Sequence, residues 1–145
     1  MHSLLYSSVA RYQMSKEDLL SLLNHSRENN IQSGITGMLI YNEQLFMQVL
    51  EGSKETIKSL YENKIKKDTR HTLVSLYLFE PIEAREFEDW SMAFHDLRDY
   101  DLKQVEGYST FLQTGFTQES IYKNLSVAKE LLVLFRDYDT SKKFA

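Results

Sequence analysis

Hydrophobic and polar positions along the chain follow two periods, and together these periods predict a series of strands and helices. Short apolar or alternating runs that are typical of strands cover residues 4–9, 34–41, 44–51, 71–79 and 90–94. Apolar residues at helical spacing cover residues 18–30, 53–65 and 118–138, and a shorter helix is predicted over residues 102–111. The first seven elements therefore follow the order β-α-β-β-α-β-β.

The first predicted helix has both a start signal and an inward face. Ser15-Lys16-Glu17-Asp18 resembles a capping box, which satisfies backbone N–H groups where a helix begins. Its apolar stripe consists of Leu19, Leu20, Leu22 and Leu23, and Ser26 and Asn30 extend that face at four-residue steps. We therefore expect Asn30 to end the inward face of this helix.

The later strands also carry specific expectations. The polar pair Asn42-Glu43 suits a tight hairpin turn, so the strands on either side of it should be antiparallel. In the strand over residues 71–79, alternation places Val74, Leu76 and Leu78 on one face and Leu73, Ser75 and Tyr77 on the other. The only proline, Pro81, is expected to separate this strand from the last one.

This order of elements predicts a ferredoxin-like α+β sandwich, in which two helices pack on one face of a largely antiparallel sheet. The C-terminal helices can cap the other face. The apolar stripe of the last helix is formed by Ile121, Leu125, Ala128, Leu132 and Phe135, and it is widened by Val127, Leu131 and Leu134. Such a wide stripe is compatible with covering the sheet, with binding a second copy of the chain, or with binding an effector protein.

Composition narrows the class of protein. A chain of 145 residues with 42% hydrophobic content suffices for one globular unit. The formal net charge of −4 gives no electrostatic reason to expect nucleic acid or a membrane as a partner. There is no cysteine, which excludes a disulfide and a thiolate metal site but does not indicate a redox compartment. There is also no run of 18 apolar residues and no basic signal-peptide start, so we expect a cytoplasmic protein. Scattered histidines and glycines predict no metal site and no enzyme active site.

One strand carries an unusual polar residue. Phe46, Gln48 and Leu50 share a face, which places an amide on an otherwise apolar surface, where it requires a polar partner. Tyr6 alternates in the same sense with Leu4, so the two polar tips can converge if their strands are neighbours. Taken alone, Gln48 also fits an amide bonded to the backbone at a strand edge, and Tyr6 an ordinary core residue.

Further motif fragments stand in a fixed order along residues 4–95. They are Tyr6 followed by serine, Asn29-Asn30, Gly34-Ile35-Thr36-Gly37, Phe46-x-Gln48-x-Leu50-Glu51-Gly52, Asp68-x-Arg70-His71 and Arg85-x-Phe87-x-x-Trp90-Ser91-Met92. In this order the fragments resemble the BLUF family, the blue-light sensors that use FAD. The resemblance implies a sensor domain over residues 1–97 and a helical extension over residues 98–145 within the same globular unit.

The resemblance also implies a bound flavin, FAD in the first place and FMN or riboflavin as alternatives. The residues that it implies as cofactor-binding are Tyr6, Leu22, Asn29, Asn30, Gln48, Lys64, Ile65 and His71. Lys64 stands where many members have an arginine, and lysine keeps the charge but lacks the planar fork of a guanidinium. The flavin ring is expected between the two helices, with Leu22 and Ile65 as apolar clamps.

In such a sensor, light drives transfer of an electron and a proton from Tyr6 through Gln48 to the flavin, and both return in the dark. Rotation or tautomerisation of the Gln48 amide then rearranges the flavin hydrogen bonds and shifts its absorption to the red. Trp90 and Met92 are the implied signalling residues, on a path through the last strand to the C-terminal helices and a partner protein. The alternative is a small-ligand or protein-binding regulatory module on the same fold, without photochemistry.

Overall fold

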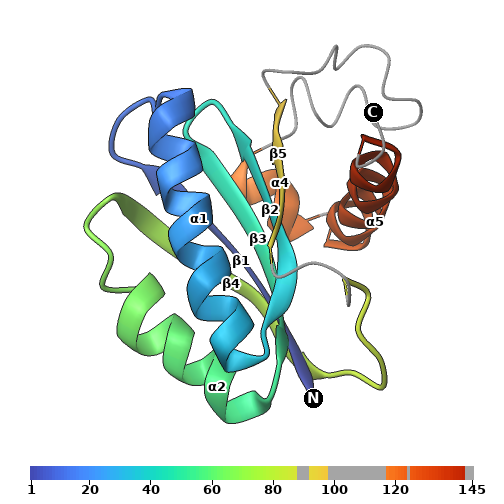
Figure 1. Ribbon diagram of the computed structural model, residues 1–145. Helices are drawn as coiled ribbons and strands as arrows, with labels where there is room; N and C mark the ends of the chain where they lie inside the picture. Colours follow the sequence, from blue (N-terminus) through green and yellow to red (C-terminus); the bar gives the residue numbers. More distant parts are fainter. Residues whose placement is uncertain (88–91, 98–116, 124, 143–145) are drawn as a thin grey trace.

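The computed structural model describes residues 1–87, 92–97, 117–123 and 125–142 (Figure 1). Its strands are β1 (His2–Ala10), β2 (Thr36–Asn42), β3 (Leu45–Gly52), β4 (His71–Pro81) and β5 (Ala93–Asp96). Its helices are α1 (Lys16–Ser33), α2 (Lys54–Leu60), the π-helical turn η1 (Tyr61–Ile65), α4 (Gln118–Lys123) and α5 (Leu125–Lys142). Over the first part of the chain this is the predicted β-α-β-β-α-β-β order.

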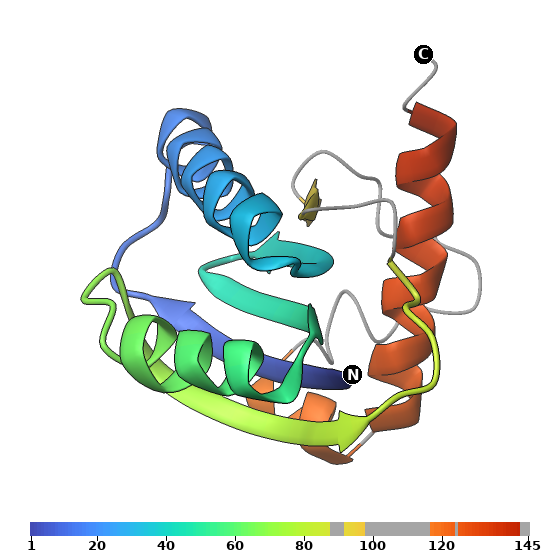
Figure 2. The same cartoon turned by 60° about the horizontal axis from the view of Figure 1, so that its bottom comes forward.

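Within the described residues, the strands form one five-stranded sheet in the order β4-β1-β3-β2-β5. β1 pairs antiparallel with both β3 and β4, β2 pairs antiparallel with β3, and β5 lies parallel to β2. Figure 2 shows α1 and α2 on one side of this sheet and α5 on the other. The ferredoxin-like α+β sandwich with C-terminal helices against the second face is therefore confirmed.

Local signals in the sequence explain how α1 begins and ends. Ser15 and Asp18 form the predicted capping box, and Gly34 ends the helix in the left-handed conformation with φ of 68°. Leu19 and Leu23 are buried, but Leu20 is 54% exposed, so the stripe of four leucines was wrong at that position. Leu20 lies 100° around the helix from Leu19, outside the arc that faces the sheet.

The other helices differ from their predicted bounds. The segment predicted as one helix over residues 53–65 is α2 followed by η1, where Lys66 N–H donates to the Tyr61 carbonyl at 3.0 Å. The segment predicted as one helix over residues 118–138 is α4 and α5. The predicted helix over residues 102–111 lies outside the described residues. None of the helices in the described ranges is long and apolar enough to span a membrane.

Two strand predictions needed correction. The hairpin turn is Glu43-Gln44, one residue later than predicted, with φ of 45° and 72°. Strand β4 does not alternate cleanly, because its register with β1 shifts twice and Leu73 has φ of 52°. As a result, Leu78 packs on the opposite face from Val74, against the C-terminal helices. β5 begins at Ala93, and Trp90 lies outside the described residues.

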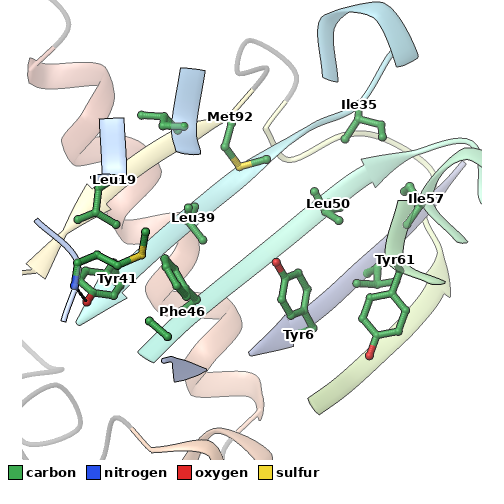
Figure 3. Close-up of a cluster of buried hydrophobic side chains, with 14 residues drawn as sticks. Tyr6, Leu19, Ile35, Leu39, Tyr41, Phe46, Leu50, Ile57, Tyr61 and Met92 are labelled. Atoms are coloured by element: carbon green, nitrogen blue, oxygen red, sulfur yellow. Dashed lines mark hydrogen bonds between the residues drawn. The ribbon is translucent and has the colours of Figure 1, made fainter. Parts of the chain in front are cut away.

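The sheet separates two apolar clusters. Figure 3 shows the one beneath α1 and α2, which includes Tyr6, Leu39, Phe46 and Leu50 from the sheet. The cluster on the other face joins sheet residues such as Met38 and Met47 to α4 and α5. Its helical members are Ile121, Leu125, Ala128, Leu131, Leu132, Leu134 and Phe135. This face of the C-terminal helices covers the sheet, which was one of the uses left open by the sequence.

Candidate functional site

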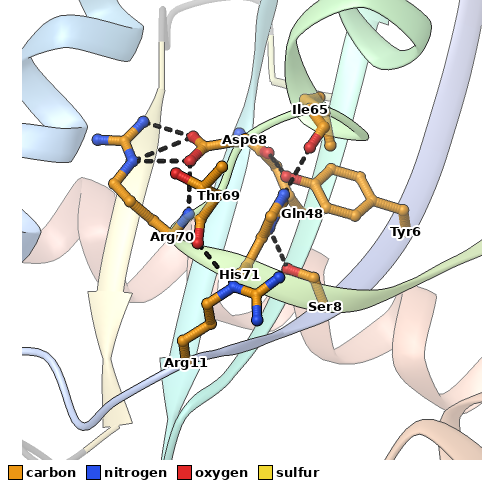
Figure 4. Close-up of polar contacts among 9 residues, drawn as sticks. All are labelled: Tyr6, Ser8, Arg11, Gln48, Ile65, Asp68, Thr69, Arg70 and His71. Carbon is orange, nitrogen blue, oxygen red and sulfur yellow. Dashed lines mark hydrogen bonds and ion pairs between the residues drawn. The ribbon is translucent and has the colours of Figure 1, made fainter.

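Tyr6 and Gln48 lie directly opposite each other on the neighbouring strands β1 and β3. Both are buried on the face beneath α1 and α2, with exposed fractions of 5% and 7%. The Tyr6 hydroxyl donates a hydrogen bond to Gln48 Oε1 (Figure 4). The sequence left the pairing of these strands open, and the structure brings the two polar tips into contact.

The other end of the Gln48 amide is directed to a third residue. Gln48 Nε2 donates to Met92 Sδ at 3.3 Å, and Met92 is 1% exposed immediately before β5. The Met92 carbonyl in turn accepts a hydrogen bond from Arg27 Nε of α1 at 2.9 Å. The amide of Gln48 therefore links β1 with the start of β5, and both of its bonds go to side chains.

A cavity of about 500 Å³ opens beside this pair. It is bounded by the sheet, α1, η1 and the segment 67–71, and its volume falls within the range of roughly 300–1,000 Å³ that is typical of cofactor sites. The residues that line it are Tyr6, Met14, Leu22, His25, Ser26, Asn29, Asn30, Leu39, Phe46, Gln48, Leu50, Leu60, Asn63, Lys64, Ile65, Lys67, Asp68, Thr69, Arg70 and His71.

All eight residues predicted to bind a cofactor line this one cavity. Leu22, Asn29 and Asn30 come from α1, and Lys64 and Ile65 come from η1, on another wall. Met92 does not line the cavity and contacts it through Gln48. Trp90 lies outside the described residues. The lining combines apolar side chains with a few amides and cations that point into the cavity. Such a lining suits a ligand that has a flat, partly polar ring and a charged tail.

His71 joins three parts of the cavity wall. Its Nε2 lies 2.5 Å from the Ile65 carbonyl, and its Nδ1 lies 2.7 Å from Ser8 Oγ. A carbonyl oxygen can only accept, so Nε2 carries the proton, and in the neutral ring Nδ1 accepts from the Ser8 hydroxyl. His71 on β4 therefore fixes the end of η1 to β1.

The segment 68–71 is held by its own charges. Arg70 Nε and Nη2 donate to the Asp68 carboxylate, with a shortest distance of 2.5 Å (Figure 4). Hydrogen bonds from Arg70 lower the pKa of Asp68, and the same pairing raises the pKa of Arg70. Arg11 Nε also donates to the Thr69 carbonyl at 2.7 Å. This segment forms a rigid, polar side of the cavity.

The environment keeps Tyr6 protonated. Burial raises the pKa of the Tyr6 phenol, and the charges of Asp68 and Tyr61 add to this rise. Tyr61 also packs edge-to-face against Tyr6, with ring centroids 5.9 Å apart. Near neutral pH, Tyr6 is therefore a hydrogen-bond donor whose proton is directed at Gln48.

Sequence reasoning missed several members of the site. His25 and Lys67 line the cavity, but His25 is a single polar residue on α1 and Lys67 is a single lysine in the turn after η1, and neither carries a recognisable signal. Asp68 and Arg70 belonged to a motif fragment that could have marked them as lining residues. Among the described residues, no group of three or more His, Asp or Glu side chains could hold a metal ion.

Known proteins resemble this chain in sequence. A family model described as BLUF, sensors of blue-light using FAD, matches residues 1–93. The photoactivated adenylate cyclase subunit beta of Euglena longa is 38% identical over 91 residues, which cover 62% of this chain and 10% of that protein. The blue light- and temperature-regulated antirepressor BluF of Escherichia coli (strain K12) is 29% identical over 136 residues, which cover 94% of this chain and 32% of that protein.

Solved structures show the same fold. The dark-state structure of the BLUF protein BlrB has a TM-score of 0.67 at 29% identity and covers 88% of this chain and 96% of BlrB. The photo-activated state of BlsA has a TM-score of 0.70 at 28% identity and covers 91% of this chain and 94% of BlsA. This chain spans only about a tenth of the length of the Euglena cyclase subunits. The family model nevertheless covers more than half of the chain, and the chain therefore belongs to the BLUF family of blue-light flavin sensors.

Proposed function

We propose that this chain is a blue-light receptor that holds FAD in the cavity beside Tyr6 and Gln48, with these two residues as its photoactive pair. The observation that carries the proposal is the buried hydrogen-bonded series from Tyr6 through Gln48 to Met92 at the wall of that cavity. In this series Tyr6 supplies a proton donor, Gln48 supplies an amide that can exchange its donor and acceptor ends, and Met92 supplies a contact next to β5.

The cavity walls supply the chemistry that a flavin requires. Leu22 of α1 and Ile65 of η1 offer apolar surface to the ring, and Asn29 and Asn30 offer amides to its polar edge. Lys64 offers a positive charge to a phosphate, without the two-pronged contact of an arginine. His71 keeps the η1 wall in place through the Ile65 carbonyl.

A bound flavin supplies blue-light absorption and an acceptor for one electron and one proton. Tyr6 is proposed as their source, because its phenol is buried and protonated and its O–H already donates to Gln48 Oε1. The proton therefore has a defined direction of transfer along that hydrogen bond.

Gln48 is proposed as the switch. Its acceptor end is directed at Tyr6 and its donor end at Met92, so rotation or tautomerisation exchanges what each neighbour receives. Met92 would then lose its donor, and β5 would shift relative to β2. His95 on β5 packs its ring 5.1 Å from the Phe135 ring of α5, so a shift of β5 reaches the C-terminal helices. If replacement of Met92 left light-dependent changes in α5 intact, this route would be wrong.

We further propose that residues 1–97 are the sensor unit, that residues 98–145 belong to the same globular unit, and that the output is contact with a partner. Relatives named as adenylate cyclases and as an antirepressor support light-regulated partnering of this kind. The partner is proposed to be an effector protein or a second copy of this chain. The protein itself is proposed to act without catalysis, in the cytoplasm.

The decisive experiment is the absorption spectrum of the purified protein before and after blue light, repeated on Tyr6→Phe and Gln48→Leu. A reversible red shift should occur in the native protein and be absent from both variants. Tyr12→Phe is the matched control, because Tyr12 is 49% exposed and does not line the cavity. A colourless protein after addition of FAD would overturn the proposal in favour of a binding module, and chromatography of the released flavin would separate FAD from FMN.

A further inference from the structure

A second cavity, of about 420 Å³, lies on the opposite face of the sheet from the flavin cavity. Its floor is formed by β1, β3 and β4, one wall by residues 82–87, and the other wall by α5. Figure 2 shows the chain after β4 passing close to α5 at this end of the sheet. The volume again falls within the range of roughly 300–1,000 Å³ that is typical of small-molecule sites.

The strand register divides the floor into an apolar row and a polar row. Leu5 of β1 lies between Leu78 of β4 and Val49 of β3. Ser3 is two residues before Leu5 on β1, and it pairs with Glu80 of β4 on one side and with Glu51 of β3 on the other. Both rows face the cavity, since alternate residues of a strand share a face. The floor is therefore amphipathic along the strand direction.

The polar row includes a hydroxyl without a partner. Ser3 is 9% exposed and lines the cavity, and within the described part of the chain its hydroxyl makes no hydrogen bond. The hydroxyl is not among the fully enclosed polar atoms that lack a partner, so it opens into the cavity, where water or a ligand can reach it. It therefore offers a free hydrogen-bonding group to a ligand at this end of the cavity.

The same row is negatively charged. Glu51 is 1% exposed, and its carboxylate accepts from Glu86 N at 2.7 Å and from Phe87 N at 2.9 Å. Arg85 donates to the Glu51 main-chain carbonyl, and no ion pair of the Glu51 carboxylate occurs among the described residues. Glu80 pairs with Lys129 of α5 at 3.4 Å, and Thr36 Oγ1, which donates to Glu51 Oε1 at 3.2 Å, accepts in turn from Arg85 Nη1. The described residues that line the cavity nevertheless include Glu51, Glu80, Glu83 and Glu86 and a single lysine, Lys129.

We propose that this cavity binds a small amphipathic organic cation, an alkylammonium with an apolar body. The ammonium group would donate to the Ser3 hydroxyl and the Glu80 carboxylate, and the apolar body would lie against Leu78 and Val133, which are less buried than Leu5. An ammonium has three donors and no acceptor, which suits a hydroxyl oxygen and carboxylates better than a neutral or anionic head does. Such a ligand contacts the sheet and α5 together.

The test is calorimetric titration of the flavin-loaded protein with n-hexylammonium, and with hexan-1-ol as the uncharged probe of the same shape. Hexylammonium should bind and hexanol should bind at least tenfold more weakly. Ser3→Ala should weaken hexylammonium by about tenfold, since it removes one acceptor from a charged donor. Glu80→Gln should weaken it further, because the change removes a charge and leaves Lys129 without its partner. Glu62→Gln, on η1, is the control and should change nothing.

Stability separates a binding role of Ser3 from a structural one. In the absence of ligand, Ser3→Ala should leave the melting temperature unchanged or raised, because the hydroxyl has no partner to lose. Equal binding of hexylammonium and hexanol, no binding of either, or a lowered melting temperature of Ser3→Ala would each overturn the proposal. None of these results depends on photochemistry, so the outcome is independent of the proposed light response.

Discussion

Tyr6 and Ser7 are neighbours on β1, yet their side chains lie on opposite faces of the sheet. The Tyr6 hydroxyl bonds to Gln48 beside a cavity of about 500 Å³. The Ser7 hydroxyl lies 2.5 Å from Tyr77 Oη and accepts from Gln118 Nε2 of α4 at 3.1 Å. On the first face the chain leaves space for a ligand, while on the second it satisfies Ser7 with its own side chains. One strand thus touches both the proposed photochemistry and the C-terminal helices.

The largest expected effect comes from the second face, at the place where side chains of α5 pack directly against β5. Phe135→Ala removes a fully buried ring between α5 and β5 and should lower the free energy of unfolding by about 3–5 kcal/mol. Denaturant titration measures this loss, and Tyr122→Ala, at a position 74% exposed, should change it by less than about 0.5 kcal/mol. A loss in Phe135→Ala that is as small as the one expected for Tyr122→Ala would show that α5 does not stabilise the sheet.

The first face should depend on its ligand instead. Free flavin at about 100 times its dissociation constant should stabilise the protein by roughly 2.7 kcal/mol, because only the folded state offers the cavity. Asn30→Ala should reduce this gain, whereas Phe135→Ala should keep it, since Phe135 lies across the sheet from the cavity. Melting curves with and without added flavin measure the gain. An unchanged gain in Asn30→Ala would remove Asn30 from the proposed flavin site.

Matched Tyr→Phe substitutions compare the two faces most directly. Tyr77→Phe deletes the hydroxyl that donates to the Gln118 carbonyl at 3.3 Å and should cost about 1 kcal/mol of stability, while the light-induced red shift persists. Tyr6→Phe deletes the corresponding hydroxyl on the first face and should abolish the shift. Absorption spectra and denaturant titration of both variants provide the comparison. Loss of the shift in Tyr77→Phe would mean that the two faces are not separate in function.

The same comparison shows how far the sequence could lead. Period-two alternation was enough to place Tyr6 and Gln48 on apolar faces of their strands, because each face assignment is local. Their direct contact depends on the pairing of β1 with β3, which are 42 residues apart at this point, and no local pattern encodes that pairing. The family resemblance implied that the two residues act together at a flavin, and it implied six further residues that line the cavity, but the strand pairing itself stayed open.

Errors occurred where backbone geometry overrides alternation. The register shifts of β4 move Leu78 to the other face, and a left-handed residue such as Leu73 gives no warning, because leucine rarely adopts that conformation. The π turn at Tyr61 is equally invisible in the apolar spacing, although it shapes the wall that carries Lys64 and Ile65. Such irregularities are frequent at functional sites, and here one of them borders the cavity proposed to hold the flavin.

The smallest expected effect comes from the Asp68–Arg70 ion pair, which forms a charged rim of the cavity on the first face. The pKa of Asp68 is lowered from 3.8 in the folded state, so ionised Asp68 stabilises the fold above that value, and its contribution is lost as pH falls through the folded pKa. Because the Asp68–Arg70 pair is partly exposed to solvent, Asp68→Asn should cost at most about 1 kcal/mol at pH 7.

The difference in unfolding free energy between native protein and Asp68→Asn should therefore shrink between pH 5 and pH 2, which denaturant titrations at several pH values measure. Glu119→Gln, which removes an exposed ion pair of α4 on the second face, is the control for general acid effects. An equal pH dependence in all three proteins would mean that Asp68 does not stabilise the rim. If Asp68→Asn were still less stable than the native protein at pH 2, the stabilising role of Asp68 would come from hydrogen-bond geometry. At that pH a protonated Asp68 no longer carries the charge that pairs with Arg70.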